Sequence, residues 1–312
     1  MEADSDPQAR TPHCDLCDHE AVFLDPVIPR HLCADHVMQD VEGRALSIIQ
    51  GHHLISPGER VAVALSGGKD STVLLHLLRR LLPGADLVAV TVDEGIEGYR
   101  EATLRSAEAN TGVLGIEHHI LSFRDLYGQS LDELVRDQPR RACSVCGILR
   151  RKAMNTLARR VGASTLATGH NLDDEAQSVL MNWLRGDRER VLRSPGENGG
   201  KGLIPRVKPL MEIPEKEVAL YGILKGLFVE LPECPYRHTA LRGEVRTILT
   251  GLECRFPGTL RRVVEGQARL SASLPPRAGE AMPLHPCERC GDLCVGGLCQ
   301  ACRLIFSPGS LR

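Results

Sequence analysis

The sequence predicts an α/β protein in which helices cover both faces of a parallel β-sheet. Over residues 41–272, short apolar runs of strand length alternate with amphipathic stretches of helical periodicity, a pattern typical of βαβ units. After about Ile213 the strand-like runs stop, and the periodicity predicts a helical extension. Closely spaced cysteine pairs near both ends of the chain predict a zinc-finger module at each terminus.

The composition is that of a globular protein with enough apolar residues to build its own cores. Of 312 residues, 42% are apolar and 25% are charged, which excludes a disordered or collagen-like chain. No apolar run approaches the roughly 18 residues of a membrane span, and the N-terminus lacks a secretory signal, so we expect a cytoplasmic protein with no membrane partner. In that compartment, twelve cysteines favour metal or sulfur chemistry over disulfides.

Changes in the pattern divide the chain into four predicted domains. Residues 1–40 and residues 274–312 are the two zinc-finger modules, and the second begins at the breaker Leu274-Pro275-Pro276. Residues 41–212 form the α/β domain, and residues 213–273 form the helical extension, which carries Cys234.

The elements of the α/β domain follow from β-branched apolar runs and from helical spacing. The first strand, Arg60–Leu65, ends at a Ser-Gly-Gly turn, and the helix after it, Asp70–Leu82, ends at Pro83-Gly84. The further predicted strands are Leu87–Val92, Ile116–Leu121 and Ser164–Thr168. The further predicted helices are Arg100–Gly112, Val145–Val161 and Leu172–Arg185, and in the extension Pro214–Leu227, Gly243–Cys254 and Pro257–Leu270.

A glycine-rich loop with the sequence SGGKDS, residues 66–71, connects the first strand to the first helix. Its small residues allow backbone N–H groups to close around a phosphate, and the start of the helix adds partial positive charge. Lys69 supplies a cation, and the Asp70 carboxylate suits Mg²⁺ bridged to the phosphates. The spacing is not that of a Walker A loop. The loop resembles that of the PP-loop pyrophosphatases, which cleave ATP between the α and β phosphates and adenylate a substrate.

A second motif, TGHNLDDE at residues 168–175, also lies between a strand and a helix. It resembles the GHxxDD segment of tRNA-modifying PP-loop enzymes. We expect Gly169 to allow close approach to the nucleotide, and Asp174 to hold metal or orient the attacked carbonyl. A structural role is compatible with this one, because Asn171 is a good helix N-cap and the acids complement the helix dipole. Backbone groups from Val90 to Val92, at the end of the second strand, are placed to contact the adenine.

The terminal cysteines have the spacing of structural zinc ligands. Each module has two knuckles of two ligands joined by a short loop, which gives a closed tetrahedral site that catalyses nothing. Both modules are also too poor in apolar residues to fold without metal. The predicted ligands are Cys14, Cys17, Cys33 and His36 in the first module and Cys287, Cys290, Cys299 and Cys302 in the second.

Three internal cysteines, Cys143, Cys146 and Cys234, form an incomplete ligand set, because three thiolates cannot close a structural zinc site. They suit three irons of a [4Fe–4S] cluster whose fourth iron stays open. As an alternative, they are redox thiols that carry and resolve a persulfide. Cys254 lies in a helical pattern, and we expect it to be a buried apolar side chain.

The charge is unevenly distributed, although the net charge is only −2. Residues 136–160 contain eight arginine or lysine side chains against one acid, Asp137. This asymmetry predicts a positive face able to bind nucleic acid, with a solvated helix face as the alternative.

Taken together, these motifs resemble the TtuA-type tRNA 2-thiouridine synthetases, with their archaeal and eukaryotic relatives that thiolate the wobble uridine. The resemblance extends from Cys14 to Cys302 and includes both cysteine modules, SGGKDS, CSVCG, GHNLDDEAQ and the later lone cysteine. The two terminal modules distinguish this family from lysidine synthetases and 2-thiocytidine enzymes, which share SGGKDS.

The resemblance implies a PP-loop (HUP-like) fold, ATP with Mg²⁺, a [4Fe–4S] cluster on Cys143, Cys146 and Cys234, and two Zn²⁺. The implied partners are tRNA, a ubiquitin-like thiocarboxylate protein as sulfur donor, and a second copy of the chain in a homodimer. Arg150 stands where a lysine is expected in the family, and it keeps the positive charge but not the compact ammonium.

The resemblance also assigns residues to roles. The implied catalytic residues are Lys69, Asp70, Arg150 and Asp174. The implied ATP-binding residues are Ala64, Ser66, Gly67, Gly68, Lys69, Asp70, Ser71, Val90, Val92, Arg150, Gly169 and Asp174. The expected tRNA contacts are Arg136, Arg140, Arg141, Arg151 and Lys152.

The predicted function is tRNA 2-thiolation, and position 54 of the T-loop is favoured over wobble position 34 as the target. ATP would adenylate the C2 carbonyl oxygen of uridine, and sulfide would then add at C2 and displace AMP. A persulfide mechanism without a cluster is an alternative for the same enzyme. The alternative of another class is a non-catalytic zinc-finger RNA-binding protein, and the intact SGGKDS and GHNLDDE motifs argue against it.

Overall fold

The computed structural model describes residues 12–191, 204–228, 231–237, 241–273 and 284–306. No helix within these ranges combines the length and the hydropathy needed to cross a bilayer.

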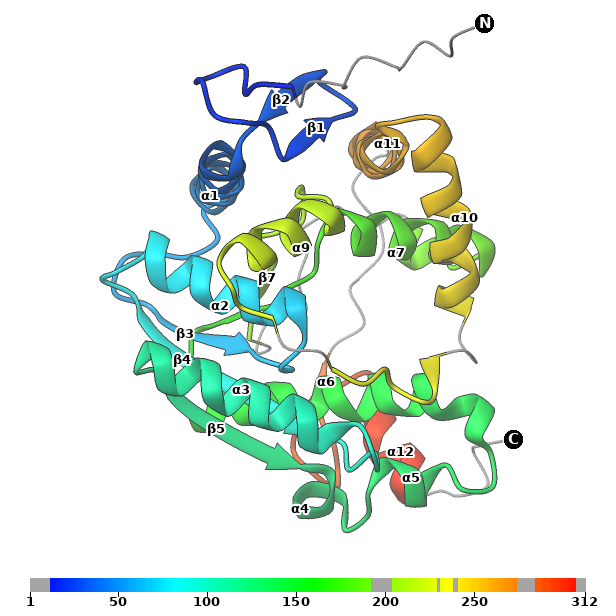
Figure 1. The fold of residues 1–312 in the computed structure, drawn as a ribbon. Coiled ribbons are helices and arrows are strands. Elements are labelled where there is room, and N and C mark those ends of the chain that lie inside the picture. Colours follow the sequence, from blue (N-terminus) through cyan, green and yellow to red (C-terminus); the bar gives the residue numbers. More distant parts are fainter. Residues whose placement is uncertain (1–11, 192–203, 229–230, 238–240, 274–283, 307–312) are drawn as a thin grey trace, which may run out of the picture.

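A parallel sheet forms the centre of the described chain (Figure 1). Its five strands lie in the order β5-β4-β3-β6-β7 among the described residues, and every neighbouring pair is parallel. The strands are β3 Arg60–Ala64, β4 Asp86–Asp93, β5 Glu117–Ser122, β6 Thr165–Ala167 and β7 Arg206–Val207. From β3 the chain builds the sheet outward through β4 and β5, and it then crosses back to add β6 on the other side of β3. This divergence makes the carboxyl end of β3 a switch point, where ligands of open α/β sheets bind.

Helices cover both faces of the sheet, as predicted. Val61 and Val63 of β3 pack into the core under α1 Ala34–Gly51, α2 Lys69–Leu81, α3 Arg100–Leu114 and α9 Glu215–Leu224. Ala62, which points the other way along the same strand, packs against α6 Ala142–Arg160. Side chains on both faces of β3 are therefore buried. This burial on two sides explains why the sequence of the strand is a continuous apolar run rather than an alternating one.

The helical extension packs mainly against the helix that follows β6. α10 Leu241–Arg255 and α11 Thr259–Ser273 lie beside α7 Leu172–Leu184 (Figure 1). The three helices share a small core in which Val245 and Leu260 are buried. α9 packs mainly against α1 and α2, and its first residue, Glu215, contacts α7 and α10. The short helices are α4 Phe123–Tyr127, α5 Leu131–Leu134, α8 Arg188–Val191 and the 3₁₀ helix η1 Pro139–Arg141.

The two cysteine-rich modules dock at different places. In the first, the hairpin of β1 Phe23–Asp25 and β2 Arg30–Leu32 shares a small core with Leu220 and Leu224 of α9. In the second, the hairpin of β8 His285–Pro286 and β9 Leu293–Cys294 precedes α12 Gln300–Phe306, which packs on α6. Ala301 of α12 is buried in the same core as Leu149 of α6.

Two sequence-based expectations are wrong in detail. α6 begins at Ala142 rather than Val145, so the Cys-x₂-Cys pair lies in its first turns instead of before it; Ala142, Val145 and Leu149 are buried at helical spacing. Cys254 is exposed, not buried. It lies ~180° around α10 from the buried Val245, on the opposite face of the helix. The two-residue strand β7 was not predicted, because so short a run has no periodicity to detect.

Candidate active site

The SGGKDS loop forms an anion-ready turn between β3 and α2. Gly67 has φ +84°, and a side chain there would place Cβ 1.9 Å from the carbonyl oxygen of Thr103, so only glycine fits. The Ser71 hydroxyl closes the turn, because it accepts from the Ser66 N–H at 3.1 Å and donates to the Gly68 carbonyl at 2.9 Å. Among the described residues, no side chain caps α2. Its first N–H groups are therefore available to a phosphate.

Lys69 lies between two carboxylates. Its Nζ is 2.8 Å from Oδ2 of Asp70 and 2.5 Å from Oε1 of Glu215, the first residue of α9. Burial alone would lower the pKa of Lys69, but Asp70 and Glu215 outweigh burial and raise it, so the lysine is charged. Glu215 in turn accepts two hydrogen bonds from Arg246 of α10, at 2.5 and 2.6 Å. Neither Glu215 nor Arg246 was found from the sequence.

The TGHNLDDE turn touches the SGGKDS loop directly. Gly169 packs so closely that a Cβ would lie 2.9 Å from the backbone carbon and oxygen of Asp70. Asn171 caps α7 by accepting from the Asp174 N–H at 3.1 Å, and its Nδ2 donates to Oδ1 of Asp70 at 3.2 Å. Asn171 therefore caps α7, as expected, and at the same time contacts the phosphate loop. Oδ1 of Asp174 accepts from Arg242 of α10 at 3.2 Å.

The acids of the two turns gather at one place. Burial raises the pKa of Asp70, and the nearby Glu215 and Asp174 carboxylates raise it further against the effect of Lys69. Burial also raises the pKa of Asp173, whose Oδ2 accepts from the Glu215 N–H at 2.7 Å. Such an excess of negative charge is stabilised by a cation, and carboxylate oxygens are the ligands that Mg²⁺ prefers.

A buried ion pair fixes the end of β4 to the phosphate loop. Arg100, 4% exposed, donates to the carbonyl oxygens of Ser66 at 3.1 Å and Val92 at 2.6 Å. Its Nε lies 2.9 Å from Oε2 of Glu94, which is also 4% exposed. Val90 and Val92 bury their side chains, and the Val90 carbonyl accepts from the Leu65 N–H at 2.9 Å. The sequence analysis did not identify this pair; its signal is an acid directly after a buried strand, followed by an arginine at the start of a helix.

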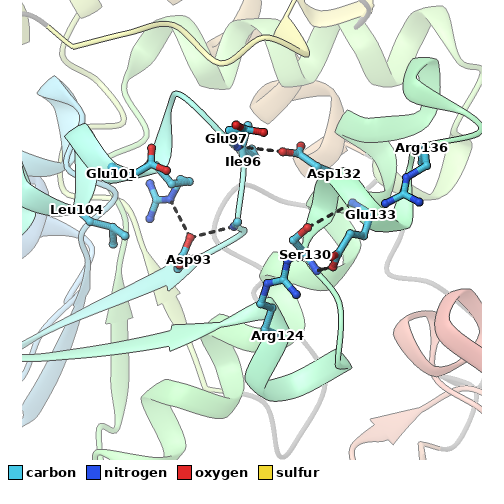
Figure 2. Close-up of a pocket in the computed structure, with 12 residues that line it drawn as sticks. Asp93, Ile96, Glu97, Glu101, Leu104, Arg124, Ser130, Asp132, Glu133 and Arg136 are labelled. Carbon is cyan, nitrogen blue, oxygen red and sulfur yellow. Dashed lines mark hydrogen bonds and ion pairs between the residues drawn. The ribbon is translucent and has the colours of Figure 1, made fainter.

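Two cavities adjoin these elements. One, of about 320 Å³, lies over the loop and is lined by Gly67, Lys69, Ser106, Phe228 and Leu231 among others. The other, of about 390 Å³, lies beyond the end of β4 and is shown in Figure 2. Acids and arginines line it together, and Glu97 donates its backbone N–H to Asp132 at 2.9 Å. The predicted tRNA contact Arg136 is one of the residues that line it (Figure 2).

The three internal cysteines come together beside Arg150. Cys146 and Cys234 border the same apolar core, and Cys143 donates its Sγ hydrogen to the carbonyl of Tyr236, two residues after Cys234, at 3.3 Å. Burial raises the pKa of Cys146 to about 12, although Arg150 opposes the shift. Nη1 of Arg150 is 3.6 Å from Oε1 of Glu94. Through Glu94 and Arg100, charged groups thus connect the cysteines to the phosphate loop.

Both terminal ligand sets converge. In each, the four ligand atoms lie within 4.8 Å of one another, and no other described group of three or more such residues does so. The Sγ atoms of Cys17 and Cys33 are 3.7 Å apart, as are those of Cys290 and Cys299. Tetrahedral zinc with Zn–S of about 2.3 Å requires S···S of roughly 3.8 Å. The residues therefore fit Zn²⁺.

Some of the basic side chains in residues 136–160 are exposed, and others are engaged in contacts within the protein. Arg136, Arg140 and Arg151 are exposed, and Arg141 is half-buried. Lys152, also expected to contact tRNA, has a side chain that is 16% exposed and that pairs with Asp292 of the C-terminal module, as does the side chain of Arg159. The charge of Lys152 is thus used to hold that module on α6.

A parallel sheet whose central strand ends in SGGKDS, with an acidic helix start held against that loop, defines a PP-loop ATP-binding protein. The model of the PP-loop domain family matches residues 38–230. The chain is 40% identical to "tRNA 2-thiolation protein NcsA" of Haloferax volcanii, over 94% of this chain and 98% of that protein. It is 39% identical to "Cytoplasmic tRNA 2-thiolation protein 1" of Bos taurus, over 94% of this chain and 87% of that protein.

A solved structure gives the same relationship. "U34-tRNA thiolase NcsA from Methanococcus maripaludis with its [4Fe-4S] cluster" superposes with a TM-score of 0.81 at 32% identity, over 94% of this chain and 95% of that chain. The chain belongs to the PP-loop family and, within it, to the tRNA 2-thiolation proteins; it is an enzyme of the tRNA sulfurtransferase class. The resemblance to TtuA-type synthetases stays a prediction, because these relatives represent its archaeal and eukaryotic branch.

Proposed function

We propose that this enzyme uses ATP to adenylate the C2 carbonyl of a tRNA uridine and then inserts sulfur there, giving 2-thiouridine. The observation that carries the proposal is the contact between the two turns at the sheet's switch point, where Asn171 bonds to Asp70. That contact joins a phosphate loop to a group of acids. The ion pair of Glu94 with Arg100, and the contact of Glu94 with Arg150, connect the same loop to the cysteines.

The phosphate loop would bind the β and γ phosphates of ATP. Its N–H groups and Lys69 would stabilise the charge that grows on pyrophosphate as it leaves. Asp70 and Asp174 would hold Mg²⁺ or orient the uridine, and the backbone of β4 from Val90 to Val92 would contact adenine. Arg150, which lies between Glu94 and Cys146, would face the nucleotide from the cysteine side.

The chemistry needs two bond exchanges at uridine. The C2 oxygen attacks the α-phosphorus of ATP, and pyrophosphate leaves. Sulfide then adds at C2, and the C2–O bond breaks as AMP departs with the former carbonyl oxygen. A uracil carbonyl is a poor electrophile, so adenylation is what supplies a leaving group.

Cys143, Cys146 and Cys234 fit a [4Fe–4S] cluster. They are three thiols near one another, yet their sulfur atoms are not among the described sets that lie within 4.8 Å, the spacing of ligands to one ion. Such a cluster supplies an iron without a protein ligand that can bind sulfide. The name of the Methanococcus maripaludis relative includes a [4Fe-4S] cluster, which supports this assignment over the persulfide alternative.

Wobble position 34 becomes the favoured target in place of T-loop position 54, because the same relative is named a U34-tRNA thiolase. Exposed Arg136, Arg140 and Arg151, with Arg141, would contact tRNA phosphates. We further propose a cytoplasmic location, since the Bos taurus relative is named a cytoplasmic protein. The proposal also includes a ubiquitin-like thiocarboxylate protein as the sulfur donor, a homodimer, and structural Zn²⁺ in both modules. It divides the chain into four domains, at residues 1–40, 41–212, 213–273 and 274–312.

The direct test is nucleoside mass spectrometry on tRNA incubated anaerobically with the enzyme, Mg-ATP and sulfide. We expect 2-thiouridine that requires ATP, and in ribonuclease fragments we expect it in the anticodon loop. An Asp70→Ala variant should form none while retaining its fold and zinc. ATP-independent product would contradict the adenylation step, and product confined to the T-loop would restore position 54.

A further inference from the structure

Glu215 occupies a position where an anion is held by two cations from different elements. Its Oε1 is 2.5 Å from Nζ of Lys69, in the phosphate loop, and 2.5 Å from Nη2 of Arg246, in α10. One oxygen atom therefore contacts both cations, and the oxygen of a phosphate can make the same two contacts. The site faces solvent in part, since the side chains of Lys69 and Arg246 are 35% and 42% exposed.

We infer that Arg246 is a further nucleotide-binding residue, which contacts the β and γ phosphates of ATP together with Lys69. In the absence of ATP, the Glu215 carboxylate occupies the position of these phosphates. The inference deepens the proposed function and rests on it, because it presumes that ATP binds at this loop. It assigns to the helical extension a direct part in binding the pyrophosphate leaving group.

The packing supports this arrangement. The Glu215 N–H is fixed by Asp173 at 2.7 Å, so the start of α9 presents the carboxylate at a set position. Arg246 lies on α10, whose buried residues Val245 and Leu249 pack in the core shared with α7. α7 begins at the turn that touches the phosphate loop, so α10 has a rigid connection to the nucleotide site. One nitrogen of Arg246, Nη2, contacts both carboxylate oxygens of Glu215, and a guanidinium that binds a carboxylate is also suited to phosphate oxygens.

The competing interpretation is a structural ion pair that only ties α10 to the loop. The two interpretations differ in what they predict for ATP and AMP. A phosphate-binding arginine should matter for ATP, which carries β and γ phosphates, and not for AMP, which lacks them. A structural pair should affect both nucleotides equally, because its loss would disturb the whole loop.

The experiment is calorimetric titration of the full-length protein with Mg-ATP and with AMP. Arg246→Gln should weaken ATP binding about tenfold or more and change AMP binding by less than about twofold. Arg246→Lys, which keeps a cation, should recover part of the loss. The matched control is Arg255→Gln, at an exposed position of the same helix, which should leave both affinities unchanged. Nε of Arg255 donates to the carbonyl of Gly251 in its own turn, and its guanidinium stacks on Phe256.

A second variant tests the role of the carboxylate. Glu215→Gln removes the competing charge, so it should strengthen ATP binding or leave it equal, never weaken it. Loss of Mg-ATP binding in that variant would make Glu215 a metal ligand and overturn the inference, as would equal weakening of ATP and AMP by Arg246→Gln. If the unaltered protein bound no ATP at all, the proposed function would fail instead, a result distinct from these.

Discussion

Replacement of Gly169 by alanine tests whether the close contact between the two turns builds the nucleotide site. The added Cβ would lie 2.9 Å from the carbon and oxygen of Asp70 and 3.0 Å from the nitrogen of Ser71. All three are backbone atoms at the start of α2, so no side chain can rotate away. Ordinary contacts are 3.4–4 Å, and the two turns must therefore separate by about half an ångström.

The separation has two measurable costs. Overpacking of this kind destabilises by about 1–3 kcal/mol, which for a domain of this size lowers the melting temperature by several degrees. It also lengthens the 3.2 Å hydrogen bond from Asn171 to Asp70 and moves Asp174 away from the loop. Because a misplacement of ~1 Å can reduce a rate about 100-fold, we expect AMP formation to fall tenfold or more.

The assay is thermal unfolding together with AMP formation in the presence of tRNA. The matched control is Gly43→Ala in α1, where nothing lies within 4 Å of the added Cβ. That substitution should raise stability by up to about 1 kcal/mol, because alanine favours the helix over glycine, and should leave the rate unchanged. A Gly169→Ala protein with unaltered melting temperature and rate would refute the assigned contact.

Three further predictions follow from the modules and the charged surface. Asp292→Asn should lower the melting temperature and loosen the C-terminal module, because it leaves Lys152 without its carboxylate partner. Proteolysis after residue 283 should increase, and an unchanged cleavage pattern would contradict the role of this ion pair in holding the module on α6. Cys14→Ser and Cys287→Ser should each remove one zinc per chain by mass spectrometry of metals, whereas Cys294→Ser, whose Sγ hydrogen goes to the Gly296 carbonyl, should remove none. Binding of tRNA should weaken tenfold or more between 50 and 200 mM salt, and Arg151→Gln should flatten that slope while Lys152→Gln should not; equal effects would return Lys152 to the RNA surface.

The phosphate loop could be predicted from the sequence because its signals are local. Residues 61–65, which include most of β3, form one uninterrupted apolar run, and SGGKDS follows that run directly, so spacing alone places Lys69 and Asp70 at a strand–helix turn. The same holds for Asn171 and Asp174, whose capping box is a pattern of neighbouring residues. For these residues local propensity and tertiary position agree.

The remaining site residues are brought in by the fold. Glu215 reaches Lys69, and Arg246 reaches Glu215, from helices far along the chain. Nothing in their own segments distinguishes these two residues from ordinary exposed charges. The same reason explains why the sequence did not predict the ion pair of Lys152, because its partner Asp292 lies in a separate module. Arg100 is a partial exception, since an arginine that begins a helix shortly after a buried strand and an acid is a detectable pattern.

Oxygen transfer tests the adenylation of uridine most directly. A tRNA whose target uridine carries ¹⁸O at C2 would be thiolated anaerobically with Mg-ATP and sulfide. The ¹⁸O content of the AMP would then be measured by mass spectrometry. We predict that each 2-thiouridine formed yields one pyrophosphate and one AMP whose phosphate contains the ¹⁸O. Unlabelled AMP, or label released into water while 2-thiouridine accumulates, would contradict attack of the C2 oxygen on the α-phosphate.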